Sequence, residues 1–202
     1  MGAIENPKQQ QIVSTARSLF WKFGIRRVSI EEICREANVS KMTFYKYFNN
    51  KVTLVKFILD EITAESMVKY QQIMNQNVSF AEKVKQSIQL KIEQTNDLTQ
   101  EFFADIHKNA DPEIRKYFNK KAQESIQVIR NDYVKAQQQG HVRPDIKPEF
   151  ILYFLNHLFE MARDEKLIKF YDSPQDLILE LTNFFFFGIL PWNNRKQESK
   201  DD

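Results

Sequence analysis

The chain has 202 residues, of which 42% are hydrophobic, so it can bury the core of one domain or two small ones and is not disordered as a whole. Its formal net charge is +2, but residues 1–60 carry ten Lys and Arg against five Asp and Glu, whereas the remainder has a net charge of −3. This asymmetry favours a basic nucleic-acid-binding head on a slightly acidic body, with an ordinary solvated charged face as the alternative.

Several classes of protein are excluded by what the sequence lacks. Cys34 is the one cysteine and no signal-peptide pattern precedes it, so we expect a cytoplasmic protein. No segment reaches the ~18 uninterrupted apolar residues of a membrane span, so no membrane partner is expected. His107, His141 and His157 form no HxxxH or HExxH pair, and no GxSxG, P-loop or GxGxxG motif occurs. We therefore expect no metal site, no cofactor and no enzymatic activity.

The first fifty residues predict three short helices. Only 4 Gly and 6 Pro interrupt the whole chain, and apolar residues recur at three and four positions, which is typical of helices. The first helix is expected to end at Gly24, and the second and third to run over 29–37 and 40–48, each beginning at a serine cap. Asn38 is expected to form the turn between them, because asparagine tolerates the left-handed conformation.

The rest of the chain also predicts helices and little else. A long fourth helix is predicted over residues 50–75, and the further ones over residues 79–94, 97–109, 112–139, 148–165 and 174–190. The predicted fold is all-α, with about nine helices. It comprises an N-terminal three-helix helix-turn-helix domain over residues 1–50 and a C-terminal helical bundle over residues 51–202.

The third predicted helix has more aromatic side chains than one core can cover. Phe44 and Phe48 are four residues apart and share a face, which leaves mostly outside the core Lys41, Met42, Thr43, Tyr45, Lys46 and Tyr47. Ammonium and hydroxyl groups suit phosphate oxygens and guanine acceptors, and methyl groups suit thymine. Lys51 adds a charge at the start of the next helix, where N–H groups also favour an anion. The alternative is that Tyr45 and Tyr47 pack against the fourth helix.

The stretch over residues 10–59 resembles the N-terminal domain of TetR-family transcriptional regulators. The matching positions are Ala16, Leu19, Phe20, Gly24, Ser29, Ile30, Ile33, Ala37, Val39, Ser40, Lys41, Thr43, Tyr45, Tyr47, Phe48, Lys51 and Leu54. The resemblance implies that the third helix enters the major groove and that DNA is contacted by Ser29, Lys41, Thr43, Tyr45, Lys46, Tyr47 and Lys51, the last on a phosphate. Met42 stands where the family usually has a small residue or proline, which affects base preference rather than binding.

The last helices predict a dimer interface. The segment 176–190 is apolar nearly all round, so it must be enclosed on most sides. Together with the helix near 150–162 it predicts half of a four-helix interface, formed by Ile151, Leu155, Leu158, Leu177, Leu181, Phe184, Phe185 and Gly188. The family that the chain resembles uses its last two helices in this way. An ordinary core within one chain is the alternative.

The resemblance also implies an effector cavity among helices four to eight. The aromatic side chains of the body suit an apolar or aromatic ligand, and the candidates are Phe103, Tyr117 and Phe154, although such residues more often form a core. The leading hypothesis is a ligand-responsive repressor that binds a near-palindromic double-stranded DNA operator as a homodimer and is released by a small-molecule effector. The alternatives are an activator or nucleoid-type binder without an inducer, and a helical small-molecule-binding scaffold without a DNA function.

Overall fold

The structure is a computed structural model that describes residues 6–95, 100–107, 111–162, 164–172 and 174–189, and every regular element among them is a helix. The helices are α1 (Pro7–Phe23), α2 (Ile30–Glu36), α3 (Lys41–Tyr47), α4 (Lys51–Met74), α5 (Phe80–Thr95), α6 (Gln100–His107), α7 (Pro112–Gln138), α8 (Pro148–Met161), α9 (Glu165–Ile168) and α10 (Pro174–Ile189). The predicted all-α fold is confirmed. None of the described helices is long and apolar enough to cross a lipid bilayer.

The described part holds one helix more than the nine or so predicted, because the helix expected over 148–165 ends early and a short helix follows it. It ends at Met161, and the short α9 begins after Asp164. The Asp164 carboxylate accepts a hydrogen bond from the Lys166 N–H at 2.8 Å, so it caps a new helix instead of continuing the old one. The expected helix ends at 97–99, 108–109 and 190 lie outside the described residues.

The chain forms two compact units. The first comprises the residues up to Met67 together with Thr95–Gln123, and the second comprises Val68–Gln94 together with the residues from Glu124 onward. Consequently α4 and α7 each contribute residues to both units. The functional division at residue 50 that the sequence predicts stays a prediction.

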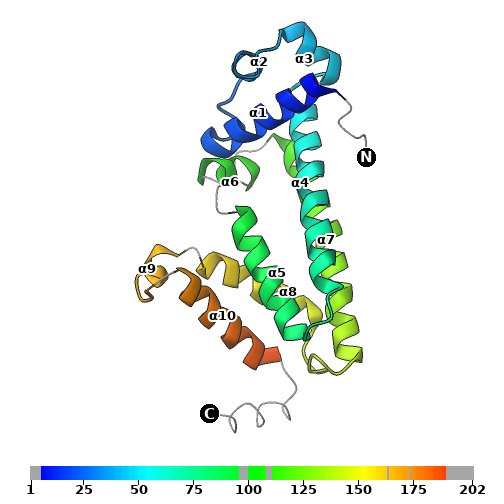
Figure 1. The fold of residues 1–202 in the computed structure, drawn as a ribbon, viewed down its shortest axis with the longest axis vertical. Helices are drawn as coiled ribbons and strands as arrows, with labels where there is room; N and C mark the ends of the chain where they lie inside the picture. Colours follow the sequence, from blue (N-terminus) through cyan, green and yellow to red (C-terminus); the bar gives the residue numbers. More distant parts are fainter. Residues whose placement is uncertain (1–5, 96–99, 108–110, 163, 173, 190–202) are drawn as a thin grey trace. The chain divides into compact units, whose positions relative to one another are not determined.

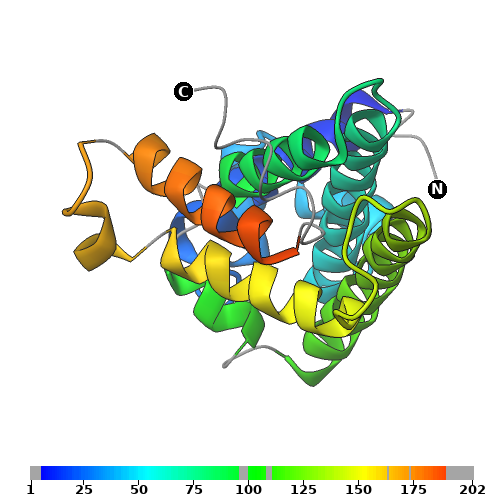
Figure 2. The same cartoon turned by 90° about the horizontal axis from the view of Figure 1, so that it is seen from below.

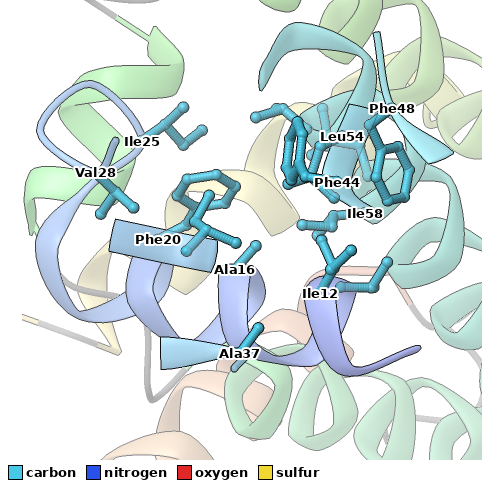
Figure 3. Close-up of a cluster of buried hydrophobic side chains, with 14 of the residues drawn as sticks. Ile12, Ala16, Phe20, Ile25, Val28, Ala37, Phe44, Phe48, Leu54 and Ile58 are labelled. Atoms are coloured by element: carbon cyan, nitrogen blue, oxygen red, sulfur yellow. The ribbon is translucent and has the colours of Figure 1, made fainter. Parts of the chain in front are cut away.

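The first unit packs α1 against the α2–α3 pair and against α6 (Figure 1). Its core is a set of buried apolar side chains spaced three or four residues apart on α1 to α4, which Figure 3 shows pointing toward one another, among them Ile12, Ala16, Phe20, Ala37, Phe44, Phe48, Leu54 and Ile58. Phe102 and Ile106 of α6 join the same cluster, and the Phe102 ring lies 4.6 Å from the Trp21 ring. The helix-turn-helix therefore shares one core with α1, α4 and α6.

Two left-handed residues set the turns of this unit. Gly24 has φ +80° and its N–H donates to the Phe20 carbonyl at 2.9 Å, so it ends α1 where the sequence predicts. Asn38 has φ +49° between α2 and α3, which confirms the prediction that it forms the turn. These two residues fix the directions in which α2 and α3 leave the core.

The core of the second unit draws on α5, α7, α8 and α10. In both Figure 1 and Figure 2 α8 (yellow) lies beside α10 (orange). Its core gathers the buried side chains Val84, Ile88, Tyr133, Ala136, Val142, Ile146, Ile151, Leu155, Leu158, Phe185 and Ile189. Tyr70 donates to the Asp132 carboxylate at 3.1 Å, so the polar end of this buried ring has a partner.

Candidate DNA-binding surface

The helix α3 is fixed to the first unit by one face. Ser40 caps it, because the serine hydroxyl oxygen accepts a hydrogen bond from the Thr43 N–H at 3.1 Å and lies 2.9 Å from the Thr43 hydroxyl. Phe44 has 0% of its surface exposed, and Phe48 is buried with its ring 5.6 Å from that of Phe57. The helix is therefore anchored by the two rings that the four-residue spacing predicts.

The opposite face of α3 is exposed. Met42 has 82% of its surface accessible and Tyr45 50%, and the side chains of Lys41 and Lys46 also face solvent. We call these four residues the α3 outer face. It presents two cations, a hydroxyl and a thioether on two turns of helix, a combination that can contact phosphate oxygens and base edges in a major groove.

Two further predicted DNA-contact residues, on α3 and at the start of α2, also make contacts within the protein. Tyr47 is half-buried and packs against the core, with the Lys46 ammonium 5.9 Å from its ring centre. Ser29 is exposed and caps α2 by accepting a hydrogen bond from the Glu32 N–H at 3.1 Å. Both residues therefore help to hold α2 and α3 in place, whatever they contact in addition.

Lys41 forms an ion pair with Glu31 of α2. The hydrogen bond from the ammonium lowers the pKa of Glu31, and the same bond raises the pKa of Lys41 above its usual range. Both side chains are exposed, so the pair is screened by solvent and salt. One cation of the α3 outer face is thus partly neutralised by α2.

Lys51 is placed differently from the other predicted phosphate contact residues. Its side chain is half-buried, and its ammonium donates hydrogen bonds to the carbonyl oxygens of Ile25 at 2.9 Å, Arg26 at 3.3 Å and Val28 at 2.9 Å. Burial lowers the pKa of Lys51, while the charge of Asp105 opposes that shift. Sequence reasoning missed this arrangement, since nothing in the pattern links Lys51 to a turn more than twenty residues earlier.

Cys34 of α2 is buried, and burial raises the pKa of its thiol. This environment favours the neutral thiol, which is poorly reactive. Within the described residues, no group of three or more His, Cys, Asp or Glu side chains gathers in a way that could hold a metal ion.

The three candidate ligand residues are described one by one, because Tyr117 and Phe154 belong to different units. The side chain of Phe103 lies outside the described residues. In the first unit, Tyr117 donates to both carboxylate oxygens of Asp60 at 2.8 and 2.7 Å, and it lines a shallow pocket of about 800 Å³ with Lys56, Arg115, Lys116 and Lys120 among its neighbours. In the second unit, Phe154 stacks on Phe185 with ring centroids 6.1 Å apart.

The residues predicted for a dimer interface divide into two groups. Five are buried within their own chain, namely Ile151, Leu155, Leu158, Leu177 and Phe185, and Leu181 is partly buried. Phe184 is 72% exposed, and Gly188 has open space where a Cβ would stand. Sequence reasoning did not single out the other exposed apolar side chains of α8 and α10, which are Phe150, Tyr153, Met161, Leu179 and Phe187. The dimer itself stays a prediction.

A short capped helix whose aromatic and basic face points outward, joined to a preceding helix by a tight turn, defines a helix-turn-helix DNA-binding protein. The sequence pattern of "Bacterial regulatory proteins, tetR family" matches residues 12–57. Residues 12–57 therefore carry the DNA-binding domain of this family, and the chain is a DNA-binding transcriptional regulator rather than an enzyme.

Relatives and solved structures agree with this assignment. The chain is 28% identical over 140 residues to the uncharacterized HTH-type transcriptional regulator YerO of Bacillus subtilis (strain 168), a match that covers 67% of this chain and 48% of that protein. The structure of the fatty acid degradation regulator FadR from Bacillus halodurans is similar with a TM-score of 0.76 and 18% identity, covering 92% of this chain and 98% of that one. A transcriptional regulator from Saccharomonospora viridis, solved in complex with choline, has a TM-score of 0.72 and 17% identity, covering 91% and 97%. These likenesses extend the shared fold beyond the helix-turn-helix.

Proposed function

We propose that the protein is a cytoplasmic, ligand-responsive transcriptional repressor that binds a near-palindromic operator as a homodimer and is released by a small apolar or aromatic effector. The observation that carries this proposal is the α3 outer face, whose phenol ring, thioether and two ammonium groups are exposed while Phe44 and Phe48 complete a core on the other side. The proposed DNA contacts are made by Lys41, Met42, Thr43, Tyr45, Lys46 and Tyr47, with Ser29 at the start of α2. Lys51 is treated separately below.

The exposed apolar side chains of α8 and α10 support the proposed homodimer. Phe150, Tyr153 and Met161 recur on one face of α8, and Leu179, Phe184 and Phe187 recur on one face of the adjacent α10. Large aromatic groups on two neighbouring helices are typical of a surface that another chain covers. A two-fold axis through this surface would present two copies of α3 to half-sites roughly 34 Å or more apart, hence the near-palindromic operator.

The proposed effector acts through a difference in affinity between two conformations. The regulator from Saccharomonospora viridis holds choline, so one protein of this fold binds a small molecule. In the present chain α4 is one continuous helix, and only three residues separate it from the end of α3, so a ligand that moves α4 would also move α3. An effector that binds more tightly to the conformation unsuited to DNA lowers the DNA affinity by that difference.

The test of DNA reading starts from a duplex that the wild-type protein selects from a random-sequence pool. Replacement of Lys46 by methionine is expected to weaken binding and to flatten the slope of log Kd against log salt by about one unit, because one phosphate contact is lost. The matched control is Lys69→Met, which removes the same charge from an exposed position on α4 outside the first unit. Selection of no duplex, or equal effects of the two variants, would contradict the proposal.

Removal of the Glu31 charge is expected to tighten DNA binding. The Glu31→Gln variant frees the Lys41 ammonium from its ion pair and deletes an anion next to the α3 outer face. We expect an affinity gain of roughly 3- to 10-fold at low salt that fades as salt rises. Fluorescence anisotropy across a salt series measures it. Glu36→Gln is the control, since Glu36 pairs with Arg35 on the same helix, and an equal gain there would contradict a specific role for Glu31.

A further inference from the structure

The turn between α1 and α2 is held from two sides. On one side the Lys51 ammonium, at the first residue of α4, donates to the carbonyl oxygens of Ile25, Arg26 and Val28. On the other side the Asp105 carboxylate of α6 accepts a hydrogen bond from the Arg26 N–H at 2.7 Å. We call Lys51, Asp105 and residues 24–28 the turn clasp. The ammonium cation donates to carbonyl oxygens and the carboxylate anion accepts from an N–H, so each charge is matched to the backbone groups that it contacts.

The donors of Lys51 are fully used within the turn clasp. An ammonium has three N–H donors, and three carbonyl oxygens lie within 3.3 Å of this one. A DNA phosphate could take the ammonium only if these bonds broke, and the carbonyls of the buried residues Ile25 and Val28 would then lose their charged donor. The geometry therefore favours a role inside the protein over a contact with the polynucleotide.

The turn is also closely packed against α6. A Cβ added to Gly24 would lie 2.6 Å from the Asp105 carboxylate and 3.3 Å from the Glu101 Cβ, so α6 approaches the turn where only glycine leaves room. The Trp21 and Phe102 rings, 4.6 Å apart, pack α1 against α6 beside it. The Arg26 N–H therefore meets its acceptor in a site with little freedom to rearrange.

We propose that Lys51 and Asp105 are positioning residues for DNA recognition, and that Lys51 is not a phosphate contact. The 24–28 turn leads directly into the Ser29 cap of α2, and α2 carries α3 through the Asn38 turn. Fixing the turn thus fixes the direction of α2 and α3 relative to α1. This inference rests on the proposed DNA function only for its readout.

The direction in which Asp105→Ala changes the DNA affinity distinguishes a positioning role from a purely electrostatic one. Asp105→Ala removes an anion from a DNA-binding unit, so long-range electrostatics alone would tighten DNA binding. The turn clasp predicts the reverse, a loss of at least about 10-fold in affinity for the duplex selected by the wild-type protein, because the charge-assisted hydrogen bond that holds the turn is lost. Asp105→Asn keeps an oxygen that accepts from the Arg26 N–H and is expected to restore most of the loss. The matched control is Glu101→Ala, which removes the same charge one turn earlier on α6 and keeps the Cβ beside Gly24.

The salt dependence decides the role of Lys51. Lys51→Met keeps the aliphatic stem and removes the ammonium, so we expect weaker DNA binding with the wild-type slope of log Kd against log salt, whereas Lys46→Met flattens that slope by about one unit. Circular dichroism at the same temperature checks that each variant is folded, and if Lys51→Met is not, the Asp105 variants decide alone. A slope flattened by Lys51→Met, or tighter binding by Asp105→Ala, would overturn the proposal.

Hydrogen exchange distinguishes failure of this proposal from failure of the proposed function. If the wild-type protein retains no duplex, DNA reading fails while the turn clasp can still be tested at the Arg26 amide. That amide is expected to be protected in the wild-type protein and in Glu101→Ala, and to exchange at least about 10-fold faster in Asp105→Ala. Equal protection in all three proteins would refute the turn clasp.

Discussion

Replacing Phe184 by glutamate is expected to convert a dimer into monomers and to remove cooperative binding to a palindromic duplex. A buried aromatic anchor at the centre of an interface contributes about 2 kcal/mol or more, which is about a 30-fold change in the dimer Kd, and a buried unpaired carboxylate adds to that cost. Phe184 is 72% exposed on its own chain, so its loss does not remove packing from the core of the second unit. Sedimentation velocity over a concentration series measures the change.

Ile126 of α7 provides the control for this substitution. It is also an exposed apolar residue of the second unit, but it lies on neither α8 nor α10. Ile126→Glu should therefore leave the dimer Kd unchanged. For a dimer whose protomers depend on association, the wild-type melting temperature should rise with protein concentration, and the Phe184→Glu melting temperature should not. A Phe184→Glu protein that stays dimeric would exclude this face as the interface.

The sequence could not decide which side of α8 and α10 its own chain would cover. α10 is apolar nearly all round, and the apolar residues of α8 cover more than one side of that helix, so a period of 3.6 residues gives no single preferred face. Leu155 and Phe185 are covered by the chain itself, whereas Tyr153 and Phe184, on the same helices, are exposed. The helices were predictable from composition and breaks, but the face left for a partner depends on how α8 and α10 pack together.

The helix-turn-helix was predictable because its determinants are local. The Ser29 and Ser40 caps and the Asn38 turn all act within three or four residues, and the structure places each of them as expected. Lys51 shows where such reasoning ends, because its three acceptors belong to residues 23 to 26 positions earlier. Asp105 lies 79 positions from its donor, which no periodicity could indicate.

Phe44 and Tyr45 are adjacent aromatic residues whose replacement by alanine is expected to have opposite main effects. One replacement mainly lowers the stability of the fold, and the other mainly lowers the DNA affinity. Phe44 is fully buried, with the Phe48 ring centroid 5.9 Å away, so Phe44→Ala should lower the free energy of unfolding by about 3–5 kcal/mol. Tyr45 is half exposed and meets Phe44 edge to face at 5.5 Å, so Tyr45→Ala should lower it by only about 1 kcal/mol. Urea denaturation monitored by circular dichroism compares the two, provided that the m-value is unchanged.

The DNA affinity of the folded protein should be lowered more by Tyr45→Ala than by Phe44→Ala, the reverse of their order in stability. Tyr45→Ala removes a ring and a hydroxyl from the α3 outer face while the helix stays anchored, so its affinity for the selected duplex should fall at least about 10-fold. The folded fraction of Phe44→Ala is measured at low temperature, where enough native protein remains. Its affinity for the duplex should fall less, because Tyr45 and the two lysines are still present on the helix. If Tyr45→Ala kept full affinity, the outward ring would have no part in reading DNA, and the solvent-facing aromatic group of α3 would need another explanation.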